Sequence, residues 1–475
     1  MRIIVGITLL AAFAPLNFAQ LKLPPYTESK LPNGVTIAMM PRTGVPLVHF
    51  RIVVRGGSEA EPKQLAGLAG MTSQLLRAGT AKRTADQFSE ELDFLGGTFG
   101  GAGGGGRGGG GGGGGGGAFS PDTSFSAEFL KKDFDRGLDL LTDALLNPSF
   151  PDDEVKKDLA RRLDQARAAK DNAQGALRSY FEASFFGREH PYGNPPDEAT
   201  LGRITRNDIL QFYKAQYVGK NMIVVVTGDF DPSEAKPKLA KAFGSVPAGN
   251  QFEWKPAAAP LRRGRMLLID KPDATQTYFI IAQPGIDRKS PDRATLEIVN
   301  TLFGGRFTSM INQELRTNSG LTYGANSSVE MQRLQGAILI STYTKTETTV
   351  QAIDLALETL KRLNEKGITA QQLASAKAYV KGLYPTRRLE TIDQLANALG
   401  DLELWGDTRD EVDGYMARID AVTLDGANAA IKKYYRTDNL TFVLLGAADK
   451  IRDGVKKYDP HFTELAAKDP GWGEK

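Results

Sequence analysis

One internal repeat limits the fold of this chain more than any other feature of its sequence. Residues 204–228 and 422–446 align without a gap, and their matched residues are separated by 218 positions. Each copy predicts a helix that starts after a threonine, ends near a tyrosine and leads through an asparagine turn into an apolar strand. The copies are too long for a solenoid repeat, so they predict two homologous domains. The matched pairs are Thr205/Thr423, Tyr217/Tyr435, Asn221/Asn439 and Gly228/Gly446.

A chain of 475 residues is also too long for one ordinary hydrophobic core. We expect an N-terminal domain over residues 25–246, a proline-rich linker over 247–264 and a C-terminal domain over 265–460. Both halves mix short apolar strands with amphipathic helices, which predicts an α+β class. The predicted strands are 35–40, 45–54, 266–270, 277–283, 337–342 and 440–445, and the predicted helices are 63–77, 85–95, 131–146, 152–185, 294–303, 348–365, 370–383 and 391–404.

The composition excludes several classes of function. The 59 Lys and Arg residues nearly balance the 56 Asp and Glu residues, so nothing indicates a nucleic acid or an anionic membrane as partner. The absence of cysteine excludes disulfides, cysteine zinc sites, thiol catalysis and a lipid anchor on cysteine. The three histidines, His49, His190 and His461, are far apart in the sequence, so a dense histidine metal site is not expected.

Residues 1–19 have the pattern of a secretory signal peptide. Arg2 precedes an apolar run from Ile3 to Pro15, and small residues surround Ala19. The alternative is a membrane anchor, but the run is shorter than the roughly 20 residues that span a bilayer. No other stretch is long and apolar enough. We therefore expect a periplasmic or secreted protein with no membrane span after signal removal.

The segment from Gly67 to Thr80 reads GLAGMTSQLLRAGT. It resembles the active-site helix of the insulinase/pitrilysin/mitochondrial-processing-peptidase family of inverted zincins, whose pattern is G-L-A-H-x-x-E-H-M-x-x-x-G-T. In that helix two histidines bind zinc, and the glutamate beside the second activates water. Here the histidine positions are Gly70 and Gln74, and the glutamate position is Ser73. We therefore expect no metal bound by this chain and no independent catalysis.

The resemblance runs from Leu31 to about Leu445 and has implications for the fold. It implies two homologous domains, each a mostly antiparallel sheet with helices packed on one face, that face each other as a clamshell. It also implies a third zinc ligand, a glutamate in active members, on the long helix after an x-P-x-F segment, which residues 147–150 match. Position along that helix indicates Asp158 or Glu154. We interpret Asp158 as part of a solvated helix face beside Lys156, Lys157 and Arg161.

The C-terminal half contains LFGG at residues 302–305 and ELRTNSGLTYG at residues 314–324. These resemble the family segment L-G-G…E-L-R-E-x-x-G-L-x-Y, whose arginine and tyrosine hold the substrate backbone or the developing oxyanion in active members. Carried over by position, they are Arg316 and Tyr323. A guanidinium and a phenol hydroxyl are donors suited to charge appearing on a carbonyl oxygen. The alternative is a surface arginine and a tyrosine packed in the core.

The remaining histidines have structural interpretations. His190 lies in an H-P-Y-G turn, which is structural in similar proteins of the family. His49 alternates within a predicted strand, and His461 lies in the C-terminal tail.

Residues 100–117 are nearly all glycine, with an unbroken run from Gly108 to Gly117. Glycine loses the most backbone entropy on ordering and brings no side chain to pack, so this glycine-rich insertion predicts a mobile loop. It follows Leu95-Gly96-Gly97, after which family members have an edge strand that pairs with extended peptide substrate. A second interpretation is therefore that the glycines weaken strand addition or form a flexible flap.

The pattern of lost and kept residues predicts a partner. Several proteins of the family are pairs, in which a subunit without the zinc motif supplies the arginine and tyrosine to a subunit that has it. This sequence resembles that type, so we expect a heterodimer with a homologous zinc-bearing peptidase subunit, zinc in that subunit and a peptide substrate. The alternative is a non-enzymatic scaffold subunit of a larger complex. The scattered histidines argue against an autonomous peptidase with unusual ligands.

Overall fold

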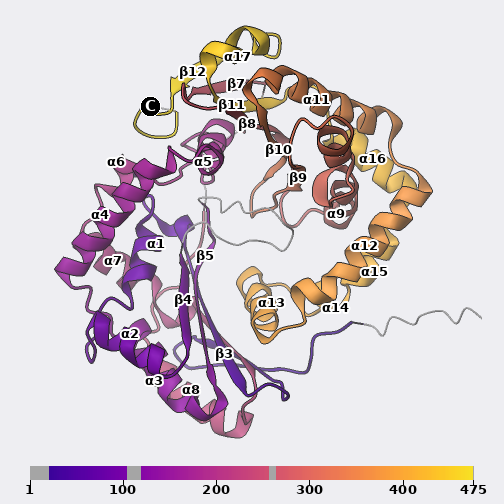
Figure 1. The fold of residues 1–475 in the computed structure, drawn as a ribbon. Coiled ribbons are helices and arrows are strands. Elements are labelled where there is room, and N and C mark those ends of the chain that lie inside the picture. The colour runs from indigo at the N-terminus through magenta and orange to yellow at the C-terminus, as the bar shows by residue number, and fades with distance from the viewer. Residues whose placement is uncertain (1–20, 104–118, 256–260, 262–263, 474–475) are drawn as a thin grey trace, which may run out of the picture.

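The computed structural model describes residues 21–103, 119–255, 261 and 264–473. These residues form two six-stranded sheets with helices, and the two halves face each other around the middle of the molecule (Figure 1). The predicted signal at residues 1–19 lies outside the described residues. Within the described ranges, every helix is too short or too polar to cross a bilayer.

The N-terminal sheet has the strand order β1-β2-β6-β3-β5-β4. Only the β2–β6 pair is parallel, and the other four pairs are antiparallel. The strands are β1 (Thr27–Lys30), β2 (Thr36–Pro41), β3 (Leu47–Arg55), β4 (Thr98–Gly103), β5 (Asp122–Leu130) and β6 (Met222–Gly228). The helices of this half are α1 (Leu68–Leu75), α2 (Ala85–Phe94), α3 (Phe134–Leu146), α4 (Asp152–Ala169), α5 (Ala173–Phe186), α6 (Glu198–Leu201), α7 (Arg206–Gln216) and α8 (Pro232–Gly244).

The C-terminal sheet has the strand order β12-β7-β11-β8-β10-β9, and β7 is parallel to both of its neighbours. Its strands are β7 (Met266–Asp270), β8 (Gln276–Pro284), β9 (Ala325–Val329), β10 (Ala337–Lys345), β11 (Thr441–Gly446) and β12 (Thr463–Ala466). The helices are α9 (Arg293–Asn300), α10 (Met310–Asn312), α11 (Thr349–Lys366), α12 (Ala370–Arg388), α13 (Ile392–Trp405), α14 (Asp410–Asp413), α15 (Tyr415–Ala421), α16 (Leu424–Tyr434) and α17 (Ala448–Val455). Wider π-helical turns follow α9 and α10 at Thr301–Gly305 and Gln313–Asn318.

The two sheets share one topology, which is the structural form of the sequence repeat. The order β2-β6-β3-β5-β4 in the first half corresponds to β7-β11-β8-β10-β9 in the second. Tyr217 and Tyr435 end α7 and α16 with nearly the same backbone angles, φ −85° and ψ 62° against φ −96° and ψ 67°. Both tyrosines are buried. The predicted α+β class with two homologous, mostly antiparallel domains is confirmed.

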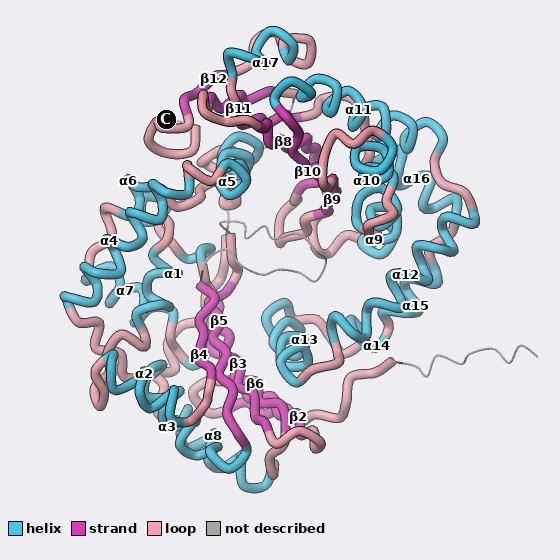
Figure 2. Tube along the Cα trace, in the orientation of Figure 1, coloured by secondary structure: helices cyan, strands magenta, loops and turns pink. Residues whose placement is uncertain are grey.

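Each half packs most of its own helices on one face of its sheet, as predicted, and receives one helix from the other half on the second face. Helix α13 lies on β3 and β6, where Leu395 and Leu399 pack against Val53 and Val225. Helix α5 lies on β8 and β11, where Leu177 joins the apolar face of the C-terminal sheet. The exchange is visible in Figure 2, where α13 lies beside β3 and α5 beside β8. Burial of these second faces joins the halves into one unit.

The single helix predicted over residues 152–185 is wrong, because the structure divides it into α4 and α5. Between them the side chain of Asn172 accepts a hydrogen bond from the backbone N–H of Gly175 at 3.2 Å and caps the start of α5. Asparagine favours such a cap over a helix interior.

The sequence analysis also missed β1, β5, β9 and β12, of which β1, β9 and β12 lie at the edges of the two sheets. Gly100 to Gly103, predicted as part of a loop, instead pair with β5 as the end of β4. Ladder hydrogen bonds come from the backbone, so they form without side chains. Residues 104–117 of the predicted insertion, and part of the predicted linker, lie outside the described residues.

Candidate functional site

Helix α1 carries the positions that hold the metal in the resembling proteins. It begins after Gly67, whose φ of 100° favours glycine. The carboxylate of Glu61 accepts hydrogen bonds from the backbone N–H groups of Gly67 at 3.0 Å and Ala69 at 2.6 Å, which satisfies free donors of the first turn. Burial raises the pKa of Glu61 to about 7, while these two hydrogen bonds and the nearby charge of Arg162 oppose the rise.

The three altered positions lie on this helix in different environments. Gly70 and Ser73 are buried, and Gln74 is partly exposed. The Ser73 hydroxyl, at 3% residue exposure, has no hydrogen-bond partner among the described residues. Gly70 presents its backbone carbonyl, which accepts a hydrogen bond from the neighbouring helix α4.

That hydrogen bond comes from Arg162, which joins the first histidine position to the third ligand position. The Nη2 atom of Arg162 donates to the Gly70 carbonyl at 2.8 Å, and its Nε donates to Asp158 Oδ2 at 2.6 Å. Arg161 donates to the other oxygen of Asp158. Asp158 is only 7% exposed, so its interpretation as a solvated residue is wrong. A carboxylate is buried at this low exposure only when it is paired, and two guanidinium groups supply that pairing here.

The donor set at these positions does not fit zinc. Gly70 has no side chain, Ser73 offers a hydroxyl and Gln74 an amide, which are weaker zinc ligands than imidazole and thiolate. Both oxygens of Asp158 already accept hydrogen bonds from arginines. In the part of the chain that the structure describes, no three His, Cys, Asp or Glu side chains are grouped as metal ligands.

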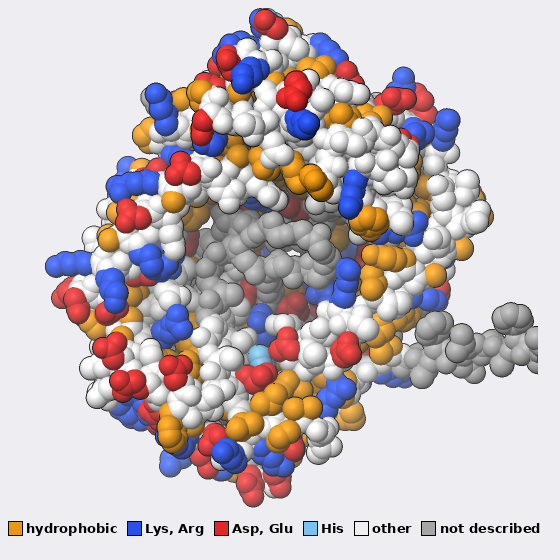
Figure 3. Space-filling model, viewed as in Figure 1, with side chains coloured by type: hydrophobic (Ala, Val, Ile, Leu, Met, Phe, Trp, Pro, Cys, Tyr) orange, Lys and Arg blue, Asp and Glu red, His pale blue; other side chains and the backbone are white. Residues whose placement is uncertain are grey.

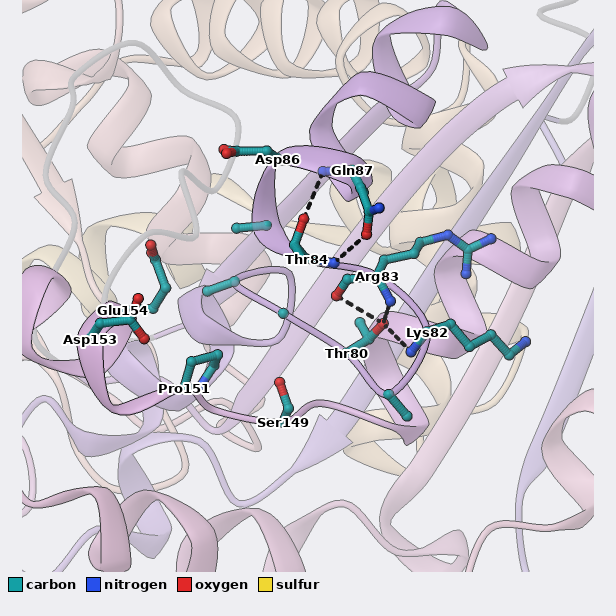
Figure 4. A pocket seen from close by; sticks show the side chains of 14 residues that line it. Thr80, Lys82, Arg83, Thr84, Asp86, Gln87, Ser149, Pro151, Asp153 and Glu154 are labelled. Atoms are coloured by element: carbon teal, nitrogen blue, oxygen red, sulfur yellow. Dashed lines mark hydrogen bonds between the residues drawn. The ribbon is translucent and has the colours of Figure 1, made fainter.

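Glu154, the alternative third ligand, lies one turn earlier on α4 and is not joined to α1. It accepts a hydrogen bond from Lys157 at 3.4 Å and lines a cavity of about 530 Å³. Figure 4 shows Asp153 and Glu154 on one side of this cavity and Lys82 and Arg83 on the other. Arg83 is already paired, because it donates to three acidic side chains, Glu91, Asp139 and Asp143. The charged side chains of Arg83 and Glu154, which line this cavity, are therefore engaged in contacts within the chain.

The predicted Arg316 and Tyr323 lie in one segment of the C-terminal half, between α10 and β9. Arg316 belongs to the π-helical turn Gln313–Asn318, a rare conformation that is frequent at functional sites. Its guanidinium carbon lies 4.5 Å from the ring centroid of Phe307. Tyr323 is 81% exposed, so the alternative of a core tyrosine is wrong. The guanidinium of Arg316 has no ion pair within the described ranges, since the neighbouring Glu314 is bound by Arg362 at 2.7 Å.

The histidines have the structural roles predicted for them. His190 is buried and accepts a hydrogen bond on Nδ1 from the backbone N–H of Tyr192 at 3.1 Å. Burial lowers the pKa of His190 to about 4. His49 lies in β3 with its Nδ1 3.3 Å from Glu128, and burial likewise lowers its pKa. His461 is exposed in the C-terminal segment.

On the face shown in Figure 3, acidic and basic side chains are interspersed over both halves. A duplicated fold with an altered zinc helix in the first half and an arginine–tyrosine segment in the second defines a protein of the two-domain zinc-peptidase class. Two family profiles match the sequence. One is described as insulinase (peptidase family M16), over residues 37–195, and the other as peptidase M16 inactive domain, over residues 203–380. The chain belongs to the insulinase family, peptidase family M16.

Known proteins agree with this assignment. An uncharacterized zinc protease of Mycobacterium leprae is 25% identical over 409 residues, which cover 85% of this chain and 87% of that protein. An uncharacterized zinc protease of Bacillus subtilis is 22% identical over 413 residues, with 86% and 95% covered. The solved structure of a peptidase M16 inactive domain from Pseudomonas fluorescens has a TM-score of 0.78 at 21% identity, covering 89% of this chain and 98% of that one. A protease structure from Helicobacter pylori gives 0.76 at 18%, with 89% and 100% covered.

Sequence reasoning missed two residues of the site. Arg162 had a usable signal, since Asp158 and Arg162 are spaced i and i+4 on a helix, where opposite charges meet. Phe307 had no comparable signal, because a single aromatic residue in a loop is most often a core residue.

Proposed function

We propose that this chain is the zinc-free subunit of a two-subunit peptidase and gives Arg316 and Tyr323 to the site of a homologous zinc-bearing subunit. One contrast within the chain carries the proposal. The metal position of the family is closed by Arg162 and Asp158, whereas Tyr323 is exposed and Arg316 is partly exposed, with no ion pair in the described part of the chain. A donor set for an oxyanion therefore remains where the metal ligands do not.

The roles follow from the chemistry of amide hydrolysis. Zinc in the partner subunit supplies an activated water. As the carbonyl oxygen of the scissile bond gains negative charge, the Arg316 guanidinium and the Tyr323 hydroxyl donate hydrogen bonds to it or to the adjacent backbone. Arginine suits this task because its charge does not titrate and its donors are fixed in a plane. Ser73 stands at the position of the water-activating glutamate and its hydroxyl cannot act as a carboxylate base. We therefore propose that this chain is inactive by itself and that the pair acts on peptides outside the cytoplasm.

The test reconstitutes this chain with a candidate partner, a homologue of similar size that carries the H-x-x-E-H motif. Neither subunit alone is expected to cleave a peptide library, and the mixture is expected to do so. Arg316→Ala/Tyr323→Ala should lower kcat by more than about 100-fold, in the range of lost oxyanion donors, with assembly by size-exclusion chromatography and thermal stability unchanged.

Arg387→Ala is the control, because Arg387 is an exposed arginine of the C-terminal half to which the proposal gives no role. Unchanged cleavage by the double variant would contradict the proposal. It would favour the alternative role of this chain as a scaffold.

A further inference from the structure

Phe307 is exposed although it is a large apolar side chain. Its exposed fraction is 66%, and five large hydrophobic side chains are strongly exposed in the described residues: Val45, Phe94, Leu130, Phe307 and Tyr323. Of the five, Phe307 contacts Arg316, and Tyr323 belongs to the same segment, residues 314–324. Single exposed hydrophobic side chains are common on protein surfaces, so the exposure of Phe307 matters here because its ring contacts Arg316.

Hydrogen bonds hold the backbone at Phe307 in place. Its carbonyl accepts a hydrogen bond from the buried side chain of Asn312 at 2.7 Å. The Oδ1 atom of the same asparagine accepts from the backbone N–H of Ala325 at 3.1 Å. Asn312 thus ties the loop that carries Phe307 to the strand that follows Tyr323.

The turn before that strand is fixed as well. The Thr342 hydroxyl donates to the Gly324 carbonyl at 2.9 Å, and its oxygen lies 3.2 Å from the Thr322 hydroxyl oxygen. Leu315, which precedes Arg316, accepts backbone hydrogen bonds from Leu321 at 2.9 Å and Thr322 at 3.2 Å. The backbones of Phe307, Arg316 and Tyr323 therefore form one rigid unit with three projecting side chains.

A ring face holds a guanidinium differently from a carboxylate. A carboxylate would occupy the N–H donors of Arg316 and neutralise its charge, but an aromatic face attracts the cation and leaves the donors at the edge of the plane free. Ordering a free arginine side chain costs rotamer entropy. A support that restricts the side chain in advance reduces that cost when the transition state forms.

We propose that Phe307 is a positioning residue, which holds the guanidinium of Arg316 in place and leaves its donors available to the substrate. The inference rests on the proposed function, since it names the residue that prepares Arg316 for that role. Phe307→Leu, which keeps apolar bulk but removes the ring, should lower kcat of the reconstituted pair by about 5- to 30-fold and change KM less than 2-fold. Phe307→Trp, which restores a ring face, should return kcat to within about 3-fold of the wild type.

The chain offers a matched control. Phe94 is 76% exposed, and the guanidinium carbon of Arg136 lies 5.1 Å from its ring centroid, far from the C-terminal unit in sequence. Phe94→Leu should leave kcat and KM unchanged, which separates the position of the ring from the general loss of a surface phenylalanine.

A double-variant cycle separates this inference from the proposed function. In an Arg316→Ala background Phe307→Leu should cause no further loss, because its effect passes through Arg316. An equal further loss in that background, or full activity of Phe307→Leu where Arg316→Ala is impaired, would overturn the role of Phe307 and leave the proposed function standing. Full activity of Arg316→Ala would overturn both.

Discussion

In the N-terminal half, Asp158 is buried between Arg161 and Arg162, whereas in the C-terminal half Arg316 lies on the exposed ring of Phe307. The two halves share a sheet topology, so the difference comes from side chains and not from architecture. At these two places, the first half pairs a buried carboxylate with arginines, and the second holds a guanidinium on an aromatic ring without an ion pair among the described residues. Two domains of one duplicated fold can therefore surround their charged side chains differently.

The largest effect is expected from restoring the motif on α1. Gly70→His/Ser73→Glu/Gln74→His should bind zinc weakly, because Arg162 places a positive charge between Gly70 and Asp158 and occupies a carboxylate oxygen. Adding Arg162→Ala should raise zinc affinity by at least about 100-fold, since it removes a like charge and frees Asp158. Zinc titration against a chelator measures the zinc affinity of each variant, and circular dichroism checks that both variants are folded. Equal affinity of the two variants would show that Arg162 does not close the site.

The next effect concerns stability. Arg162→Met should lower the free energy of unfolding by about 1.5–3 kcal/mol, because Gly70 and Asp158 lose a charged hydrogen-bond donor in a buried setting. Arg161→Ala is the control. Its side chain is about half exposed, so the loss should stay below about 1 kcal/mol. Urea unfolding at pH 7 compares the two, and equal losses would contradict the bridging role of Arg162.

The smallest effect is a dependence on pH. Burial raises the pKa of Glu61 to about 7, above its ordinary value of 4.5, so the folded protein retains a proton that the unfolded chain releases. Stability from this group is therefore greatest below about pH 4.5 and decreases as the pH rises toward 7.

Glu61→Gln should reduce this loss of stability between pH 5 and 8 by about 1–2 kcal/mol. It should not abolish the loss, because burial also raises the pKa of Glu59 and Glu403 to about 7. Thermal unfolding across this pH range measures the slope. A slope equal to that of the wild type would show that Glu61 is not protonated in the folded protein near neutral pH.

Much of the fold was predictable because it depends on local patterns. The repeated threonine, tyrosine and asparagine positions mark a cap, a buried helix end and a turn, and each constrains only its neighbours. The predicted strand over 266–270 has the bounds of β7, and the predicted helix over 391–404 corresponds to α13. The motif around Gly70 indicated the family through residue types alone.

The failures concern contacts between distant segments. The sequence placed Asp158 on a solvated face, because its neighbours on α4 are basic. Only the packing of α4 against α1 brings Arg162 to the Gly70 carbonyl, 92 positions away. The exchange of α5 and α13 between the sheets also has no local signal, since an apolar helix face does not specify which sheet will cover it.

The sequence by itself determined the duplication, the α+β class, the loss of the zinc ligands and the presence of Arg316 and Tyr323, because these follow from residue types and short-range spacing. Tertiary structure decided that an arginine pairs with the remaining acid of the old site and that Phe307 lies under Arg316. Charge pairing and ring contacts depend on distances between segments, and the folded chain alone sets those distances.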